Sequence, residues 1–166
     1  MKRVFTVPAL LIVVLLAGAG VYLYSKQPTR QGQIELRNLQ GSVTVRYDER
    51  GVPHIRAENE TDLYRALGYV HAQDRLFQME AMRRLARGEL AEVLGPKLLD
   101  TDKLFRSLRI RERAASYVAS LDKQSPAWKG LQAYLDGINQ YQDTHAAPVE
   151  FDVLGIPKRP FTAEDS

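Results

Sequence analysis

Between Asn59 and Gly95 the hydrophobic and polar positions repeat with the spacing of a long α-helix. Asn59 is suited to cap the start of this helix, and Gly88 is typical of the residue that ends one. The apolar positions form a wide band, which indicates burial on more than one side. The residues of this band are Leu63, Leu67, Val70, Leu76, Phe77, Met79, Ala81, Met82 and Leu85. The pattern therefore predicts a core helix against which the neighbouring segments pack.

Alternating apolar and polar residues before this helix predict β-strands. One alternation involves Ile34, Leu36 and Leu39, and Gly41 interrupts it. A second covers Ser42–Tyr47, where the apolar residues share one face of the predicted strand.

A turn motif follows the second strand. Asp48 and Gly51 occupy the first and fourth positions of a type I turn pattern. Pro53 lacks a backbone N–H, so we expect it to stay out of the strand ladder, with the second strand at an edge or beginning beyond it. The motif predicts a β-hairpin that leads into the long helix.

After the long helix, apolar spacing predicts a further helical segment from about Thr101 to Leu121, with its arginines on the outer side. Ser125 followed by Pro126 is typical of a helix start. The residues that follow Pro148 are expected to be extended. Together these patterns predict an α+β body, an N-terminal β-hairpin followed by a mainly helical segment.

The last residues of the sequence contain another helix-start pattern. Thr162 and Asp165 have the spacing of a capping box, with acidic residues in the predicted first turn. We interpret this pattern as the start of a helix that continues elsewhere, and we expect the sequence to be the N-terminal part of a longer precursor.

An uncharged apolar run occupies residues 4–24, with basic residues at Lys2, Arg3 and Lys26. As a helix the run is roughly 31 Å long, about the thickness of a membrane core. It is interpreted either as a signal peptide, cleaved near Ala17–Ala19, or as a transmembrane anchor. Both interpretations place the body outside the cytoplasm, anchored in the inner membrane and facing the periplasm or exported to the periplasm.

These patterns divide the chain into four parts. Residues 1–3 are a basic N-terminus, residues 4–24 the anchor or signal peptide, residues 25–33 a polar linker and residues 34–166 one domain.

Charge and cysteine content exclude several functions. The formal net charge is +3, but residues 1–30 contain basic and no acidic residues, so the body is nearly neutral. Arginines of the body alternate with acids and leucines, as on solvated helix faces, and no nucleic-acid partner is expected. The chain has no cysteine, which excludes disulfides, a thiolate nucleophile and cysteine metal sites.

The histidines lie far apart in the sequence, and none has metal-ligand spacing to another ligand, so no metal site is expected in this chain. A polar row on the long helix offers two interpretations. His71 and Asp74 have the residue types of a base and its orienting group, which would require a nearby Ser or Cys nucleophile. The favoured interpretation is a buried structural network that joins hairpin and helix. Its predicted members are His54, His71, Asp74, Arg75 and Gln78.

The body contains two distinctive blocks, the turn Asp48–Ile55 and the helical block Ala72–Glu80. Two further blocks follow in the chain, Tyr134–Asn139 and Phe151–Asp165. In this order the blocks resemble the penicillin acylase family of N-terminal nucleophile amidases, which includes cephalosporin and acyl-homoserine-lactone acylases. The first two blocks carry most of the resemblance, which covers residues 42–166.

The resemblance implies an αββα hydrolase made as a zymogen that cuts itself into an α chain and a β chain. The β chain of the same precursor would be the partner of this chain, and its N-terminal Ser the nucleophile that hydrolyses penicillin-type or N-acyl amides. No catalytic residue is then expected in this chain, which should be inactive alone. Calcium is possible in the complete enzyme. The competing hypothesis is a membrane-tethered, non-catalytic interaction or scaffold module derived from an acylase α chain.

Overall fold

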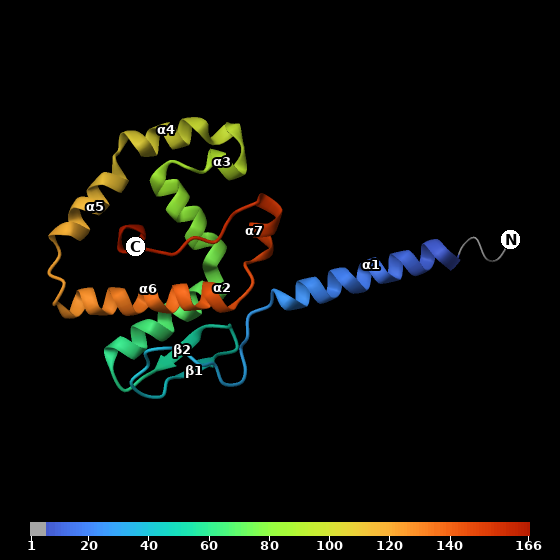
Figure 1. Ribbon diagram of the computed structural model, residues 1–166, viewed down its shortest axis with the longest axis horizontal. Coiled ribbons are helices and arrows are strands. Elements are labelled where there is room, and N and C mark those ends of the chain that lie inside the picture. Colours follow the sequence, from blue (N-terminus) through green and yellow to red (C-terminus); the bar gives the residue numbers. More distant parts are fainter. Residues whose placement is uncertain (1–5) are drawn as a thin grey trace.

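The computed structural model describes the backbone of residues 6–166 and the side chains from Leu10 onward. Lys2, Arg3 and the first residues of the predicted apolar run lie outside the described residues. Figure 1 shows the elements in chain order: α1 (Thr6–Ser25), β1 (Thr44–Tyr47), β2 (Pro53–Arg56), α2 (Glu60–Arg87), α3 (Ala91–Leu94), η1 (Pro96–Leu98), α4 (Leu99–Ser107), α5 (Ile110–Ser120), α6 (Pro126–Thr144), α7 (Val149–Leu154) and η2 (Ala163–Asp165).

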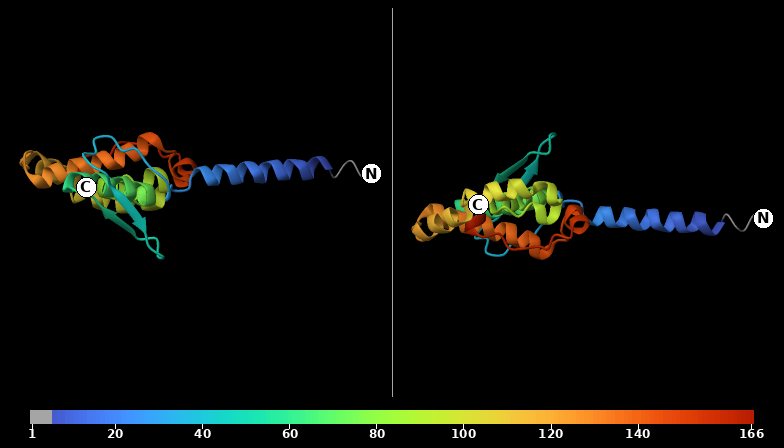
Figure 2. Two further views of the ribbon diagram at one scale, coloured as in Figure 1. Left: turned by 90° about the horizontal axis from the view of Figure 1, so that it is seen from below. Right: turned by 90° about the horizontal axis from the view of Figure 1, so that it is seen from above.

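The chain is mostly helical with one small antiparallel sheet, which confirms the predicted α+β class. Helices α2 and α6 cross at the centre of the body, and α3, α4 and α5 form an arch from the end of α2 to the start of α6 (Figure 1). The C-terminal segment lies inside this arch. The hairpin projects from one side of the body, and α1 extends away from it (Figure 2).

The predicted limits of the long helix are confirmed. The side-chain oxygen of Asn59 accepts a hydrogen bond from the backbone N–H of Asp62 at 2.8 Å. At the other end Gly88 adopts a left-handed conformation with φ of 64°, which costs glycine little because it has no Cβ. The start of α6 is also as predicted, since Ser125 caps the N–H of Trp128 at 3.2 Å.

The hairpin forms as predicted, apart from one residue. The N–H of Gly51 donates to the carbonyl of Asp48 at 2.9 Å, which closes the turn. Pro53 was expected outside the ladder, but it is the first residue of β2 and lies opposite Tyr47. Proline is tolerated at this position because the first residue of an edge strand needs no ladder N–H.

The earlier strand predicted at Ile34–Leu39 is wrong, because these residues form a loop. The N–H of Arg37 donates to Oε1 of Gln140 at 2.7 Å, and Nε2 of Gln140 donates back to the Arg37 carbonyl at 3.2 Å. A side chain of α6 therefore satisfies backbone groups that a partner strand would otherwise pair.

Two helical predictions also differ from the structure. The single helix expected from Thr101 to Leu121 is broken between α4 and α5, where Arg109 has a positive φ of 54°. Residues Val149–Leu154 form α7 instead of an extended segment. The capping box of Thr162 is present, and within the described residues it opens only the short helix η2.

The core fills the contact between α2, α6 and the C-terminal segment. It contains Tyr69, Ala72, Leu76, Leu135, Ile138, Tyr141, Phe151, Ile156 and Phe161. Leu76 and Ile138 are almost fully buried. These side chains come from sequence-distant segments, so burying them fixes the fold around α2.

Among the described side chains, those of helix α1 that contact the body lie near its C-terminal end. The hydroxyl of Tyr22 donates to Asp152 at 2.5 Å, and Nζ of Lys26 donates to the same carboxylate at 2.6 Å. The apolar side chains from Leu10 to Tyr24 are exposed. Within residues 6–166, no helix combines the length and apolarity needed to cross a membrane. The anchor and signal-peptide interpretations of residues 4–24 both stay predictions.

Candidate functional site

The helix crossing that organises the body depends on two glycines. A Cβ atom on Gly68 would lie 1.9 Å from the carbonyl oxygen of Tyr134, and one on Gly137 would lie 1.9 Å from that of Arg65. Any larger residue at either position would clash with backbone that is fixed inside a helix. Glycine therefore allows α2 and α6 to approach closely and positions the charged side chains beside the crossing.

The first charged cluster surrounds Asp62 near the start of α2. Its carboxylate is fully buried and accepts hydrogen bonds from the N–H groups of Gln40 and Gly41, each at 2.9 Å, and from Nδ2 of Asn59 at 2.8 Å. Arg65 donates to Asp62 at 3.2 Å and to Asp136 of α6 at 2.8 Å. The cluster ties the loop before the hairpin to both helices.

The hydrogen bonds to Asp62 change its acidity. Burial by itself would raise the pKa of this carboxyl group, but the bonds from Asn59, Gly41 and Gln40, with the charge of Arg65, lower it below its ordinary value of 3.8. Asp62 is therefore held as a carboxylate.

The second charged cluster surrounds Glu80, which is 1% exposed. Its two oxygens accept from Nε of Arg83 at 2.9 Å and from Nε of Arg84 at 2.7 Å. Arg83 also donates to the carbonyl of Pro160 at 3.0 Å, and its guanidinium lies 4.2 Å from the ring centre of Phe161. This cluster fixes the C-terminal segment against α2.

Neighbouring arginines extend this cluster in two directions. Arg87 donates to Asp165 of η2 at 2.5 Å, and Arg84 pairs with Glu92 of α3 at 3.2 Å. Asp102 accepts from the N–H groups of Leu90 and Ala91 at 2.9 and 2.8 Å, so it caps α3. The buried charges of Asp62, Glu80 and Asp102 thus have partners, as burial requires.

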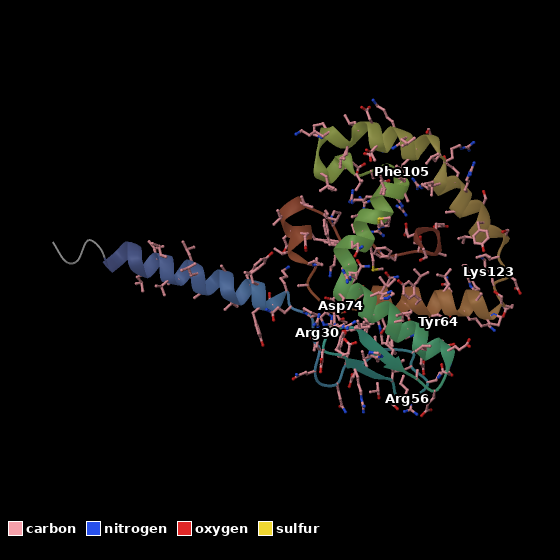
Figure 3. All side chains as sticks on the ribbon, turned by 180° about the vertical axis from the view of Figure 1, so that it is seen from behind. Arg30, Arg56, Tyr64, Asp74, Phe105 and Lys123 are labelled. Carbon is pink, nitrogen blue, oxygen red and sulfur yellow. The ribbon has the colours of Figure 1, made fainter. Side chains whose placement is uncertain are left out.

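The predicted network residues are placed differently, and within the described residues they do not join into one buried group. His71, Arg75 and Gln78 are exposed on α2. His54 is exposed on the hairpin, with Nε2 3.5 Å from Asp48. Asp74 is half-buried, and its Oδ1 lies 3.7 Å from a guanidinium nitrogen of Arg30. The two residues are labelled in Figure 3.

The contacts of His71 do not match the triad interpretation. Its Nδ1 lies 3.1 Å from the hydroxyl of Tyr134, and among the described residues no Ser is within hydrogen-bond distance of its ring. Burial and the charge of Arg75 lower the pKa of His71, while the charge of Asp74 opposes this change. A neutral imidazole bonded to a phenol is consistent with a structural contact.

A threonine hydroxyl lies beside another imidazole in the described residues. Thr144 Oγ1 lies 2.9 Å from Nδ1 of His145, but the same hydroxyl donates to the carbonyl of Gln140 at 2.7 Å. Nε2 of His145 lies 3.5 Å from the hydroxyl of Tyr69. Because the Thr144 proton is directed to the backbone and no carboxylate orients the imidazole, the pair lacks the geometry of an activated nucleophile.

Among the side chains that the structure describes, no three from His, Cys, Asp or Glu converge in a way that could hold a metal ion.

The structure does form a large cavity between α2, α5, α6 and η2. Its volume is about 700 Å³. The exposed polar row of α2, His71, Arg75 and Gln78, lies along one wall, and Met79 and Met82 lie beside it. The row that was expected to be buried therefore faces an open hollow inside the arch.

Sequence reasoning missed Glu80, Arg83, Arg84 and Arg65 as the buried charged groups. A signal was present, because Glu80 precedes Arg83 and Arg84 by three and four residues, the spacing of neighbours on a helix surface. The same spacing relates Asp62 to Arg65.

Comparison with known proteins relates this chain to one family of enzymes. A family model described as penicillin amidase matches residues 42–166. The penicillin acylase 2 proenzyme of Pseudomonas sp. (strain SE83) is 39% identical over 140 residues, which cover 84% of this chain and 18% of that protein. The acyl-homoserine lactone acylase QuiP of Pseudomonas putida is 40% identical over 142 residues, covering 84% of this chain and 17% of that protein.

Solved structures show the same relationship. A thermostable penicillin G acylase from Alcaligenes faecalis matches with a TM-score of 0.64 and 33% sequence identity, covering 75% of this chain and 67% of that chain. The chain spans less than a fifth of the length of the curated relatives described above, at 18% and 17%.

Proposed function

This chain belongs to the penicillin amidase family of amidohydrolases, and we propose that it is the N-terminal, non-catalytic part of an enzyme that hydrolyses linear amide bonds. The supporting observation is that the family match spans residues 42–166, and that the buried carboxylates of Asp62, Glu80 and Asp102 are engaged in contacts within the chain. Contacts of this kind stabilise a fold, which is the role proposed for this part of the enzyme.

The nucleophile of the proposed enzyme lies in a downstream chain of the same precursor. We assign it to an N-terminal Ser whose own α-amine is the base, because an α-amine has a pKa near neutrality. One relative is itself named a proenzyme, which supports synthesis as a precursor that must be cleaved. The present chain would hold the catalytic chain in place and take no part in bond breaking.

The proposed substrate class is an N-acyl amide with a small-molecule leaving group. Relatives are named for penicillin and for acyl-homoserine lactones, and we propose that the scissile bond here is likewise a linear amide. The acyl group would pass from the amide to the nucleophile and then to water.

Export of the body to the periplasm is also proposed. Lys2 and Arg3 precede an uncharged apolar run, and Ala17–Ala19 offers small residues suited to signal-peptide cleavage. Mass spectrometry of the protein from the periplasmic fraction should find an N-terminus close to Ala19. Recovery of the intact chain from the cytoplasmic fraction alone would contradict export.

Amide hydrolysis by two preparations tests the proposed function. Chain 1–166 and the product of the complete gene are each incubated with phenylacetyl and long-chain acyl p-nitroanilides. We expect hydrolysis only from the complete product, at least 1,000-fold above the isolated chain. Equal activity of the two preparations would place the chemistry within residues 1–166 and refute the proposal.

A further inference from the structure

A continuous groove runs along the C-terminal half of α2 beside α5. Three hollows of about 700, 330 and 200 Å³ adjoin one another there, and all three are lined by Ala86 and Ile110. We call this feature the α2–α5 groove. Its length along two helices distinguishes it from an isolated surface pit.

The floor of the α2–α5 groove is apolar. Met79, Met82, Ile110, Ala114 and Phe161 line its largest hollow. Met82 is 58% exposed. Exposed methionine side chains are typical of adaptable binding surfaces.

Helix α5 packs only loosely against the rest of the described residues. Among its residues, Ile110–Ser120, none is buried, and Tyr117 is 66% exposed. A helix this short is marginal in water unless an apolar face is covered. A partner that fills the groove would cover the face of α5 that lines it.

The margins of the groove carry positive charge that the described residues leave unpaired. Arg75 lies along the α2 side and Arg111 along the α5 side, and neither forms an ion pair within residues 10–166. Arg83 and Arg87 also line the groove, but Asp165 lies 3.7 and 2.5 Å from them and offsets their charge.

The acidic residue Glu164 also borders the groove, and its carboxylate accepts a hydrogen bond from the hydroxyl of Thr162 at 3.0 Å. Glu89 and Glu112 line the 330 Å³ hollow as well, and Glu112 lies 3.8 Å from Arg109. The groove keeps a net positive charge, because its lining arginines outnumber these acidic residues and Asp165. The arginines are Arg75, Arg83, Arg87, Arg106, Arg109 and Arg111.

We propose that the α2–α5 groove is the docking site for an amphipathic helix of the catalytic part of the same enzyme. The apolar stripe of that helix would cover Met79, Met82 and Ile110, and acidic residues beside the stripe would face Arg75 and Arg111. An apolar floor with charged margins between two helices suits this helix-in-groove mode of recognition. The inference rests on the proposed function, since it names the catalytic part as the occupant.

Cysteine accessibility gives a direct test, because the chain contains no native cysteine. Met82→Cys places a thiol in the groove, and Asp100→Cys is the control, since the Asp100 side chain is 95% exposed on α4. Each variant is labelled with a maleimide, both as chain 1–166 and in the assembled product of the complete gene, and mass spectrometry locates the label. We expect position 82 to react at least tenfold more slowly in the assembled enzyme, relative to position 100.

Reversing the charge of one arginine at a time on α5 tests whether the helix that docks in the groove is acidic. Arg111 lines the groove, whereas Arg113 of the same helix is exposed and lines none of its three hollows. Arg111→Glu should lower the yield of assembled enzyme at least fivefold, while Arg113→Glu should leave it within twofold of the unchanged protein. Circular dichroism of chain 1–166 checks that both variants fold.

The possible failures can be told apart. An assembled, active enzyme in which Met82→Cys reacts as fast as in the isolated chain would overturn the docking site and leave the proposed function intact. Equal effects of the two arginine reversals would overturn the acidic occupant. A gene that encodes no catalytic chain beyond Ser166 would overturn the proposed function and this occupant together.

Discussion

At the scale of single residues, the chain stabilises its fold with buried carboxylates that are completely surrounded by donors. Asp62 receives two backbone N–H bonds, a side-chain amide bond and an arginine. Glu80 lies between Arg83 and Arg84. Removing one member of such a buried group is costly, because the remaining charge or N–H loses its partner.

Asp62→Asn should lower the free energy of unfolding and make that free energy depend less on pH in acid. The folded-state pKa of Asp62 lies below the ordinary 3.8, so its contribution is complete above 3.8 and is lost as the pH falls through the folded-state value. We expect the substitution to lower the free energy of unfolding by about 3 kcal/mol at pH 7. Urea unfolding of chain 1–166 between pH 2 and pH 7 measures both effects.

The exposed Asp100 provides the control for this titration. Its side chain is 95% exposed, so Asp100→Asn should change the free energy of unfolding by less than about 0.5 kcal/mol. An Asp62→Asn variant with the acid dependence of the unchanged chain would show that this carboxylate is not a source of that dependence.

The polar residues of α2 show where sequence reasoning is weakest. Helical spacing identified a face that contains His71, Arg75 and Gln78, but it could not tell whether that face packs against the body or borders a cavity. The deciding partners of the buried charges come from distant segments, such as Pro160 for Arg83 and Asp136 for Arg65. Spacing within one helix contains no information about those contacts.

At the scale of elements, the crossing of α2 over α6 determines the shape of the body. Gly68 and Gly137 face backbone of the opposite helix, and the main apolar core lies beside them. The close approach also allows Arg65 of α2 to reach Asp136 of α6. Packing and ion pairing at this crossing therefore depend on the same pair of glycines.

Gly137→Ala should destabilise the chain strongly, because the new Cβ would lie 1.9 Å from the carbonyl oxygen of Arg65. We expect a loss of about 3 kcal/mol in the free energy of unfolding, measured in urea. Gly130→Ala in the same helix is the control. Its Cβ would lie 3.0 Å from the ring of Tyr64, which is 41% exposed and can move. Similar losses for both variants would contradict the role assigned to the crossing.

The break between α4 and α5 allows a second test at this scale. Arg109 has a φ of 54°, a conformation that favours glycine. Arg109→Gly should therefore raise the free energy of unfolding by about 1 kcal/mol, seen as a higher thermal midpoint. Arg113→Gly, inside α5, should lower the free energy of unfolding by about the same amount, because glycine weakens a helix interior. Changes of the same sign would argue against the backbone explanation.

Local sequence signals predicted the elements that depend on local chemistry. Asn59, Gly88 and Ser125 marked helix ends correctly, and Asp48 with Gly51 marked the turn. The break at Arg109 was missed because arginine is not typical of a left-handed position. The loop at Ile34–Leu39 was mistaken for a strand, since its alternation gave no sign that Gln140 would satisfy the backbone.

At the scale of the whole molecule, the arch and the helix crossing enclose an open groove with an apolar floor. The arch leaves large apolar side chains exposed, including Leu104 at 56% and Tyr117 at 66%. Surfaces of this kind mark interaction sites when they form one patch. Family membership, internally paired charges and an uncovered groove together support a structural role in a larger amidohydrolase.

The location of the reactive nucleophile tests this account most directly. The assembled product of the complete gene is treated with phenylmethylsulfonyl fluoride, and the modified residue is located by peptide mass spectrometry. The account predicts a single adduct on the N-terminal residue of a chain that begins after residue 166, with loss of amide hydrolysis in proportion to labelling. An inactivating adduct on any residue between 1 and 166 would contradict it.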